Sequence, residues 1–153
     1  MKTLIVKKSI EFSETDLAGI VHFSNFAKYI ELAEHEFFRK IGSSVVLPRD
    51  DFGNHYGWPR KSASFEFLSP LRFEDNIEIR MTMKSLRAAT MTYCCEIYLV
   101  QEKSDVLVAR AEATIVYSRF YDQEDRIEAL IIPDALRRKI EQFWLEKNLN
   151  NSN

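Results

Sequence analysis

The apolar pattern between Asn25 and Gly42 constrains the fold more than any other part of the sequence. Its large side chains recur at steps of three and four residues, which places them on one face of a helix. The stripe consists of Phe26, Ile30, Ala33, Phe37 and Ile41. Ser24 or Asn25 suits the N-cap, and Gly42 suits the end. We therefore expect one helix of about 25 Å, long enough to cross a small domain.

A short polar loop before this helix carries the residues with chemical potential. Asp16 lies a few residues before the helix, and Gly19 allows the chain between them to turn tightly. The backbone N–H groups from Phe23 to Asn25 should lack partners, because the first turn of a helix offers them no carbonyl. A carboxylate beside such amides can attack or deprotonate while they hold an oxyanion. On spacing alone, an ordinary loop or capping aspartate is the simpler interpretation.

A family resemblance changes this interpretation. The run T-D-L-A-G-I-V-H-F-S-N-F resembles the signature of the hot-dog acyl-CoA thioesterases, in the branch that includes 4-hydroxybenzoyl-CoA thioesterase. The matching positions are Asp16, Gly19, Val21, His22, Phe23, Asn25 and Phe26. The resemblance implies a hot-dog fold, in which an antiparallel sheet wraps around the long helix.

The resemblance also implies roles for particular residues. Asp16 corresponds to the catalytic carboxylate, and the backbone N–H of Phe23 to the group that polarises the thioester carbonyl. Many relatives have Tyr-His where this chain has His22 and Phe23, so any role of a histidine side chain moves by one residue. The remaining motif residues and Trp58, which resembles an aromatic lining the acyl pocket, are expected to contact substrate. Homodimers or homotetramers are also implied.

Coenzyme A would have to be held by scattered cations, because the sequence has no Gly-rich phosphate loop. Lys84, Arg87 and Thr90 flank a connection between two strands, and Arg119 lies near the end of the last strand. These residues are candidates for contacts with the phosphates. For each of them alone, an ordinary surface position is a simpler interpretation than a ligand contact.

Composition restricts the class of protein. Residues 1–153 are expected to form one domain, and a net charge of −2 with dispersed basic residues argues against nucleic acid as a partner. Lysines interrupt the apolar runs near the N-terminus, and no apolar stretch is long enough to span a membrane. Cys94 and Cys95 are adjacent, so they point to opposite faces of a strand and suggest a reduced, cytoplasmic protein.

Strand patterns occupy most of the remaining chain. Strands are expected at 4–12 (near a sheet edge), 58–68, 76–86, 90–100 and 106–120. Residues 43–57 are rich in Gly, Pro, Asn and Asp and predict a connecting loop. Pro133 should open a C-terminal helix, and 148–153 should form a frayed tail. The fold class predicted is α+β, a helix packed on an antiparallel sheet.

Three alternatives compete at the proposed site. Glu31 is the second choice for the catalytic carboxylate. A hot-dog dehydratase or hydratase would pair His22 with Glu31, although the H-G-G signature of those enzymes is absent. A third possibility is a non-catalytic module that binds acyl thioesters or a partner. Glu31, Glu34 and His35 have spacings that suit metal ligands, but a solvated helix face is the simpler explanation.

The leading hypothesis is an acyl-CoA thioesterase with no cofactor and no metal. Its substrate would be an aromatic or a short to medium aliphatic acyl thioester, carried by coenzyme A or an acyl carrier protein. Asp16 would act as nucleophile or as general base, and the sequence does not choose between these roles.

Overall fold

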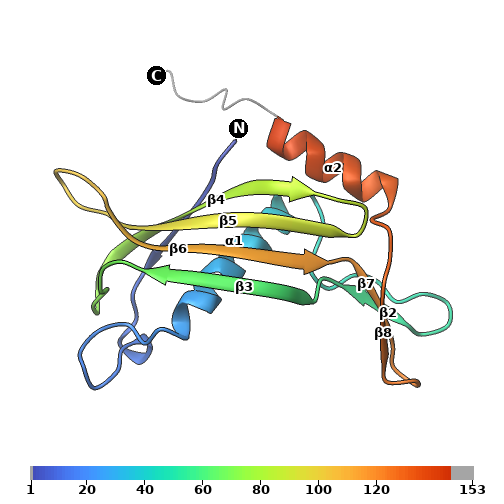
Figure 1. The fold of residues 1–153 in the computed structure, drawn as a ribbon, viewed down its shortest axis with the longest axis horizontal. Coiled ribbons are helices and arrows are strands. Elements are labelled where there is room, and N and C mark those ends of the chain that lie inside the picture. The colour runs from blue at the N-terminus through green and yellow to red at the C-terminus, as the bar shows by residue number, and fades with distance from the viewer. Residues whose placement is uncertain (1, 146–153) are drawn as a thin grey trace.

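The computed structural model describes residues 2–145, and Figure 1 shows its helices and strands. In chain order they are β1 (Leu4–Ser9), the 3-10 turn η1 (Phe12–Glu14), α1 (Asn25–Lys40), β2 (His55–Gly57), β3 (Arg60–Phe67), β4 (Asn76–Leu86), β5 (Thr90–Leu99), β6 (Val106–Val116), β7 (Ser118–Tyr121), β8 (Arg126–Ala129) and α2 (Asp134–Leu145). The predicted α+β class is confirmed. The predicted strand at 76–86 agrees with β4 at both ends.

Five strands form one antiparallel sheet in the order β1-β4-β5-β6-β3. Helix α1 lies behind this sheet in Figure 1 and crosses it obliquely. The prediction that the first strand lies at an edge is confirmed, since β1 pairs with β4 alone among the described strands. The other edge is β3, which pairs only with β6 within residues 2–145.

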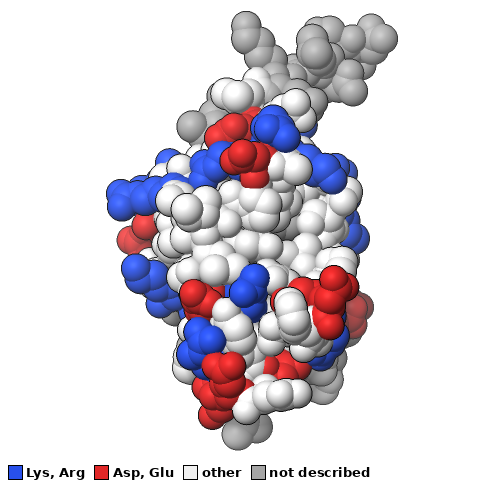
Figure 2. Space-filling view, turned by 90° about the vertical axis from the view of Figure 1, so that its right-hand side faces the viewer, with Lys and Arg blue, Asp and Glu red and all other residues white. Residues whose placement is uncertain are grey.

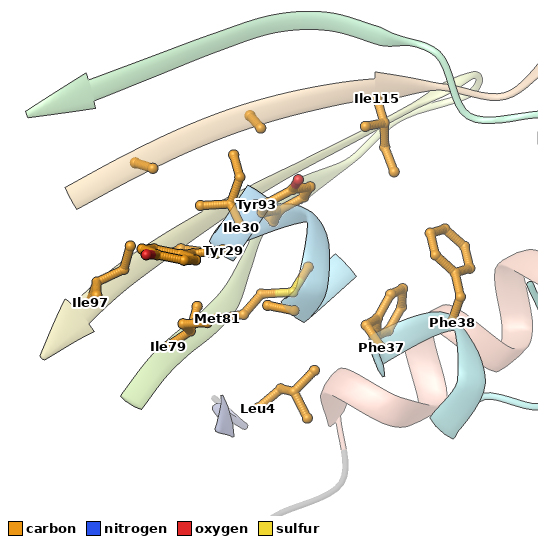
Figure 3. Packing of buried hydrophobic residues seen from close by; sticks show 14 of the residues in the cluster. Leu4, Tyr29, Ile30, Phe37, Phe38, Ile79, Met81, Tyr93, Ile97 and Ile115 are labelled. Carbon is orange, nitrogen blue, oxygen red and sulfur yellow. The ribbon is translucent and has the colours of Figure 1, made fainter. Parts of the chain in front are cut away.

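The core lies between α1 and one face of the sheet. Alternate residues of β4 and β5 point into it, as their period of two predicts. The buried side chains on these strands are Ile77, Ile79, Met81, Met91, Tyr93, Cys95 and Ile97. Figure 3 shows how several of them meet Tyr29, Ile30 and Phe37 of α1. Burial of each large apolar side chain contributes about 1.5–3 kcal/mol, so this layer fixes α1 against the sheet.

Helix α1 follows its predicted pattern closely. All five residues of the apolar stripe are buried. Gly42 has a φ of +66°, and the N–H of Ser43 donates to the Phe38 carbonyl at 2.9 Å, which ends the helix. Ser24 occupies the N-cap position, but its side chain makes no capping hydrogen bond. The predicted capping role of that side chain is therefore wrong.

The single strand predicted at 106–120 is wrong, because it divides at Tyr117. The N–H of Tyr117 donates to the Ala89 carbonyl at 2.8 Å, and its own carbonyl accepts from the N–H of Leu130 at 2.9 Å. These bonds turn the chain out of the large sheet. Beyond them, β7 pairs with β2 and β8 in a separate three-stranded sheet. Strand β2 lies within the segment that was predicted as a loop.

Helix α2 begins directly after Pro133, as predicted, and packs its buried residues on the end of α1. Phe143 and Trp144 both contact the ring of Phe37, at centroid distances of 5.3 and 5.2 Å. The tail predicted at 148–153 lies outside the described residues. No helix within residues 2–145 is long and apolar enough to cross a membrane.

Candidate active site

Asp16 lies in a tight exposed loop between η1 and α1. Its N–H donates to the Ile20 carbonyl at 3.0 Å, and the N–H of Gly19 donates back to the Asp16 carbonyl at 2.9 Å. Gly19 has a φ of +74°, which confirms that the turn requires glycine. The N–H of Ala18 donates to Asp16 Oδ1 at 2.8 Å. Within residues 2–145, Oδ2 has no hydrogen-bond partner and is available to substrate or water.

Two contacts tie this loop to the start of α1. A bridge between Thr15 and Val21 closes the loop. The carbonyl of Glu14 accepts two hydrogen bonds, from the His22 N–H at 2.9 Å and from Asn25 Nδ2 at 2.8 Å. Asp16 and the N-terminus of α1 are therefore held together by main-chain contacts and by the side-chain amide of Asn25.

The backbone N–H of Phe23 makes no hydrogen bond within residues 2–145. Its neighbours differ, because the N–H of Ser24 donates to His22 Nδ1 at 3.3 Å and that of Asn25 to the His22 carbonyl at 3.0 Å. The prediction of free amides is thus wrong for Ser24 and Asn25 and holds for Phe23. A free amide at a helix N-terminus is suited to bind a developing negative charge.

The side chain of His22 takes part in the local structure of the loop. Its Nδ1 lies 2.8 Å from Ser24 Oγ, and its ring lies against the ring of Phe23 with centroids 4.6 Å apart. The imidazole therefore contacts both Phe23, which carries the free amide, and Ser24, which follows it.

Large apolar side chains around Asp16 are open to solvent. Leu17 is fully exposed, and Phe12 and Phe23 are 73% and 66% exposed. The ring of Phe12 contacts that of Phe73, which is 49% exposed, edge to edge at 5.7 Å. Exposed apolar groups of this size commonly mark a surface that a ligand or another protein covers.

Four of the predicted substrate-binding residues lie at this end of the molecule. Gly19 is in the Asp16 loop. Val21, Asn25 and Phe26 are buried: the N–H of Val21 donates to the Leu71 carbonyl at 2.8 Å, and the ring of Phe26 packs on Phe67 at 5.0 Å. These three support the loop from beneath and do not face open solvent.

The other five predicted residues lie at the opposite end of the large sheet. Strand β4 leads away from the Asp16 loop, and its length separates the two ends by about 33 Å. Trp58, Lys84, Arg87, Thr90 and Arg119 all belong to the strand ends and turns at the far side. Figure 2 looks at this far end and shows Lys and Arg interspersed with Asp and Glu around an uncharged area. One chain therefore does not bring these residues to Asp16.

Lys84, Arg119 and Trp58 at the far end each have defined partners within the chain. Lys84 Nζ lies 2.5 Å from Glu112 Oε2, and this contact raises the pKa of Lys84. Arg119 donates to the hydroxyls of Tyr121 and Tyr56 at 3.0 and 2.9 Å, which raises its pKa. The Trp58 ring is buried between Phe38 and Tyr117, at 5.3 Å from each.

The predicted solvated face of α1 is only partly solvated. Glu31 is exposed, as expected, whereas Glu34 is 3% exposed. Glu34 Oε2 accepts from Arg60 Nη2 at 2.6 Å and from the Tyr93 hydroxyl at 2.5 Å. No local pattern indicates this cluster, because its members are far apart in the chain. Within residues 2–145, no three His, Cys, Asp or Glu side chains gather as metal ligands would.

Comparison with known proteins identifies the family. The sequence profile of the thioesterase-like superfamily matches residues 10–140. The chain belongs to this superfamily. A putative esterase of Aquifex aeolicus is 33% identical over 107 residues, covering 70% of this chain and 78% of the relative. The acyl-CoA thioesterase YbgC of Helicobacter pylori is 33% identical over 95 residues, covering 62% and 67%.

Solved structures agree on the fold of this thioesterase-like chain. A mutant of 4-hydroxybenzoyl CoA thioesterase, complexed with 4-hydroxybenzoyl CoA, superposes with a TM-score of 0.77 at 19% identity, covering 92% of this chain and 99% of the other. The predicted hot-dog fold is confirmed, and the chain is a member of an enzyme superfamily of thioester hydrolases.

Proposed function

We propose that this protein hydrolyses acyl-CoA thioesters and that Asp16 is its catalytic carboxylate. Water cleaves the C–S bond of the substrate, giving a carboxylic acid and the free thiol of coenzyme A. One observation carries the proposal: the exposed Asp16 carboxylate and the free N–H of Phe23 belong to one loop that is tied together at Glu14.

The chemistry of these two groups matches the reaction. The Phe23 N–H would donate to the thioester oxygen, which gains negative charge when the carbonyl carbon becomes tetrahedral. Asp16 would supply the attacking group, in one of two ways. Its carboxylate would attack the carbonyl carbon to form a mixed anhydride that water then hydrolyses, or it would take a proton from the attacking water. Both routes need the same placement of carboxylate and amide.

An aromatic acyl group is our first choice for the substrate. Two relatives, from Pseudomonas and Synechocystis, are named for 4-hydroxybenzoyl-CoA and 1,4-dihydroxy-2-naphthoyl-CoA. The exposed rings of Phe12, Phe23 and Phe73 beside Asp16 would suit an aromatic or a short to medium aliphatic group. A cytoplasmic location stays a prediction.

The test is the release of free thiol from a panel of aromatic and aliphatic acyl-CoAs. Asp16→Asn retains the side-chain oxygen that accepts from Ala18, so the loop should keep its shape while the rate falls at least about 100-fold. Glu31→Gln is the matched control and should retain the wild-type rate. Equal rates for wild type and Asp16→Asn would exclude Asp16. If Glu31→Gln loses activity instead, the alternative carboxylate is correct. Absence of thiol release with turnover of 3-hydroxyacyl thioesters would favour a dehydratase.

We further propose that the working enzyme is a dimer joined through β3. This edge strand is eight residues long, and Phe67 at its end and Leu68 directly after it are exposed. A two-fold antiparallel pair of β3 strands would set the Asp16 end of one copy beside the far end of the other. Trp58, Lys84, Arg87, Thr90 and Arg119 of one subunit would then lie near Asp16 of its partner. A tetramer of such dimers stays a prediction.

Subunit mixing tests the composite site. Sedimentation equilibrium should give twice the chain mass of 18.0 kDa. Asp16→Asn dimers should have a lowered kcat, and Arg87→Glu dimers should have a raised KM. Refolding them together should restore about a quarter of wild-type activity, because half of the dimers then carry one intact site of two. A monomeric enzyme, or a mixture no more active than its components, would contradict the shared site.

A further inference from the structure

A second carboxylate lies two residues before Asp16 and faces the interior. The side chain of Glu14 is only 12% exposed. Its Oε2 lies 3.2 Å from Lys8 Nζ on β1 and accepts the Glu11 N–H at 2.6 Å. The Lys8 side chain is itself 20% exposed, so water screens this ion pair less than it screens a surface pair. Glu14 is therefore anchored to the edge strand of the sheet.

The main chain of Glu14 connects that anchor to the candidate site. Its carbonyl accepts the N–H of His22 and Nδ2 of Asn25. These two residues lie on either side of the free Phe23 amide. Asp16 follows two residues later in the chain. Glu14 is thus the structural link between the carboxylate and the amide.

The surroundings of Glu14 leave it little freedom to move. Tyr29 of α1 is 1% exposed and lies beside it. Burial raises the pKa of Tyr29, and the nearby Glu14 carboxylate raises it further. The Lys8 ammonium lies 5.8 Å from the centroid of the Tyr29 ring. Glu14 is consequently confined between β1 and α1.

We propose that Glu14, held by Lys8, is a positioning residue that sets the placement of Asp16 relative to the Phe23 amide. This inference rests on the proposed function. Loss of the ion pair would release the η1 turn and shift the Glu14 carbonyl, which holds both flanks of Phe23. A displacement of 1 Å in a catalytic group costs up to about 100-fold in rate, so a smaller shift should cost about tenfold. The substrate does not contact the inward-facing Glu14, so KM should change little.

The test compares two neighbouring lysines of β1. Lys8→Met removes the shielded ion pair, whereas Lys7→Met removes a contact with Glu78 at 3.6 Å in which the lysine is 80% exposed. Thiol release should show kcat about tenfold lower in Lys8→Met, with KM within twofold of wild type. Lys7→Met should match wild type. Lys8→Arg keeps the charge and should restore most of kcat.

A double-mutant cycle adds a second readout. Glu14→Gln should lower kcat about as much as Lys8→Met, and the double variant should be no slower than either one, because both changes break the same link. Should Glu14→Gln fail to fold, the Lys8→Met and Lys8→Arg pair decides the question. Unchanged kcat in Lys8→Met, or an equal loss in Lys7→Met, would overturn the positioning role while Asp16→Asn still abolishes turnover. If Asp16→Asn also stays active, the proposed function itself fails.

Discussion

Asp16, in the loop before α1, and Glu34, within α1, are two carboxylates in opposite environments. Asp16 precedes α1, is exposed, and has one oxygen without a partner within residues 2–145. Glu34 lies in the middle of α1, is 3% exposed, and receives two hydrogen bonds on one oxygen. The Asp16 carboxylate is therefore available for chemistry, whereas the hydrogen bonds of the Glu34 carboxylate stabilise the fold.

The partners of Glu34 explain how its charge is tolerated. Burial opposes the charge on Arg60, but Tyr93 and Glu34 more than offset it, and the pKa of Arg60 is raised. Burial also raises the pKa of Tyr93, with a further contribution from Glu34. The cluster of Glu34, Arg60 and Tyr93 joins α1 to β3 and β5. Perturbed pKa values often mark active sites, but here they accompany a satisfied structural network.

The largest effect on stability should follow removal of the cation. Arg60→Met leaves Glu34 buried without a counter-charge and should lower the free energy of unfolding by about 3 kcal/mol. Urea denaturation measures this change. Lys103→Met, at an exposed position in the turn between β5 and β6, should change it by less than about 0.5 kcal/mol. A loss below 1 kcal/mol for Arg60→Met would mean that the cluster does not hold α1 to the sheet.

A smaller effect should follow loss of the Tyr93 hydroxyl. Tyr93→Phe removes one hydrogen bond to Glu34 and should cost about 1–2 kcal/mol at pH 7. Because the pKa of Tyr93 is raised above its ordinary value of 10.0, the folded state keeps this proton when the unfolded chain releases it. Wild-type stability should therefore fall as pH rises above about 10, and less steeply in Tyr93→Phe. Parallel slopes in the two proteins would contradict this assignment.

Local patterns predicted most elements of the fold. The stripe from Phe26 to Ile41 and the alternation in β4 are set by short-range periodicity, and both agree with the structure. The break at Tyr117 was not predicted, because its cause is hydrogen bonds to Ala89 and Leu130 in other segments. The small β2-β7-β8 sheet was missed for the same reason.

The residues of the candidate site likewise fall into those that a local motif predicts and those that depend on the tertiary structure. Asp16, Gly19 and the Phe23 amide follow from a contiguous motif, so the sequence predicted them together. The position of Lys84, Arg87 and Arg119 depends on strand order, which periodicity does not encode. The burial of Glu34 depends on Arg60, 26 residues away. Lys8 and Glu14 were likewise missed, since their ion pair forms only when η1 folds back on β1.

The most direct test applies one chemical change to both carboxylates and measures rate and stability on the same preparations. Asp16→Asn and Glu34→Gln each replace a carboxylate by an amide. We predict that Asp16→Asn loses at least about 100-fold in thiol release and keeps its unfolding free energy within about 0.5 kcal/mol. Glu34→Gln should lose about 2 kcal/mol of stability and keep its rate. An Asp16→Asn protein that is folded and fully active would contradict the account.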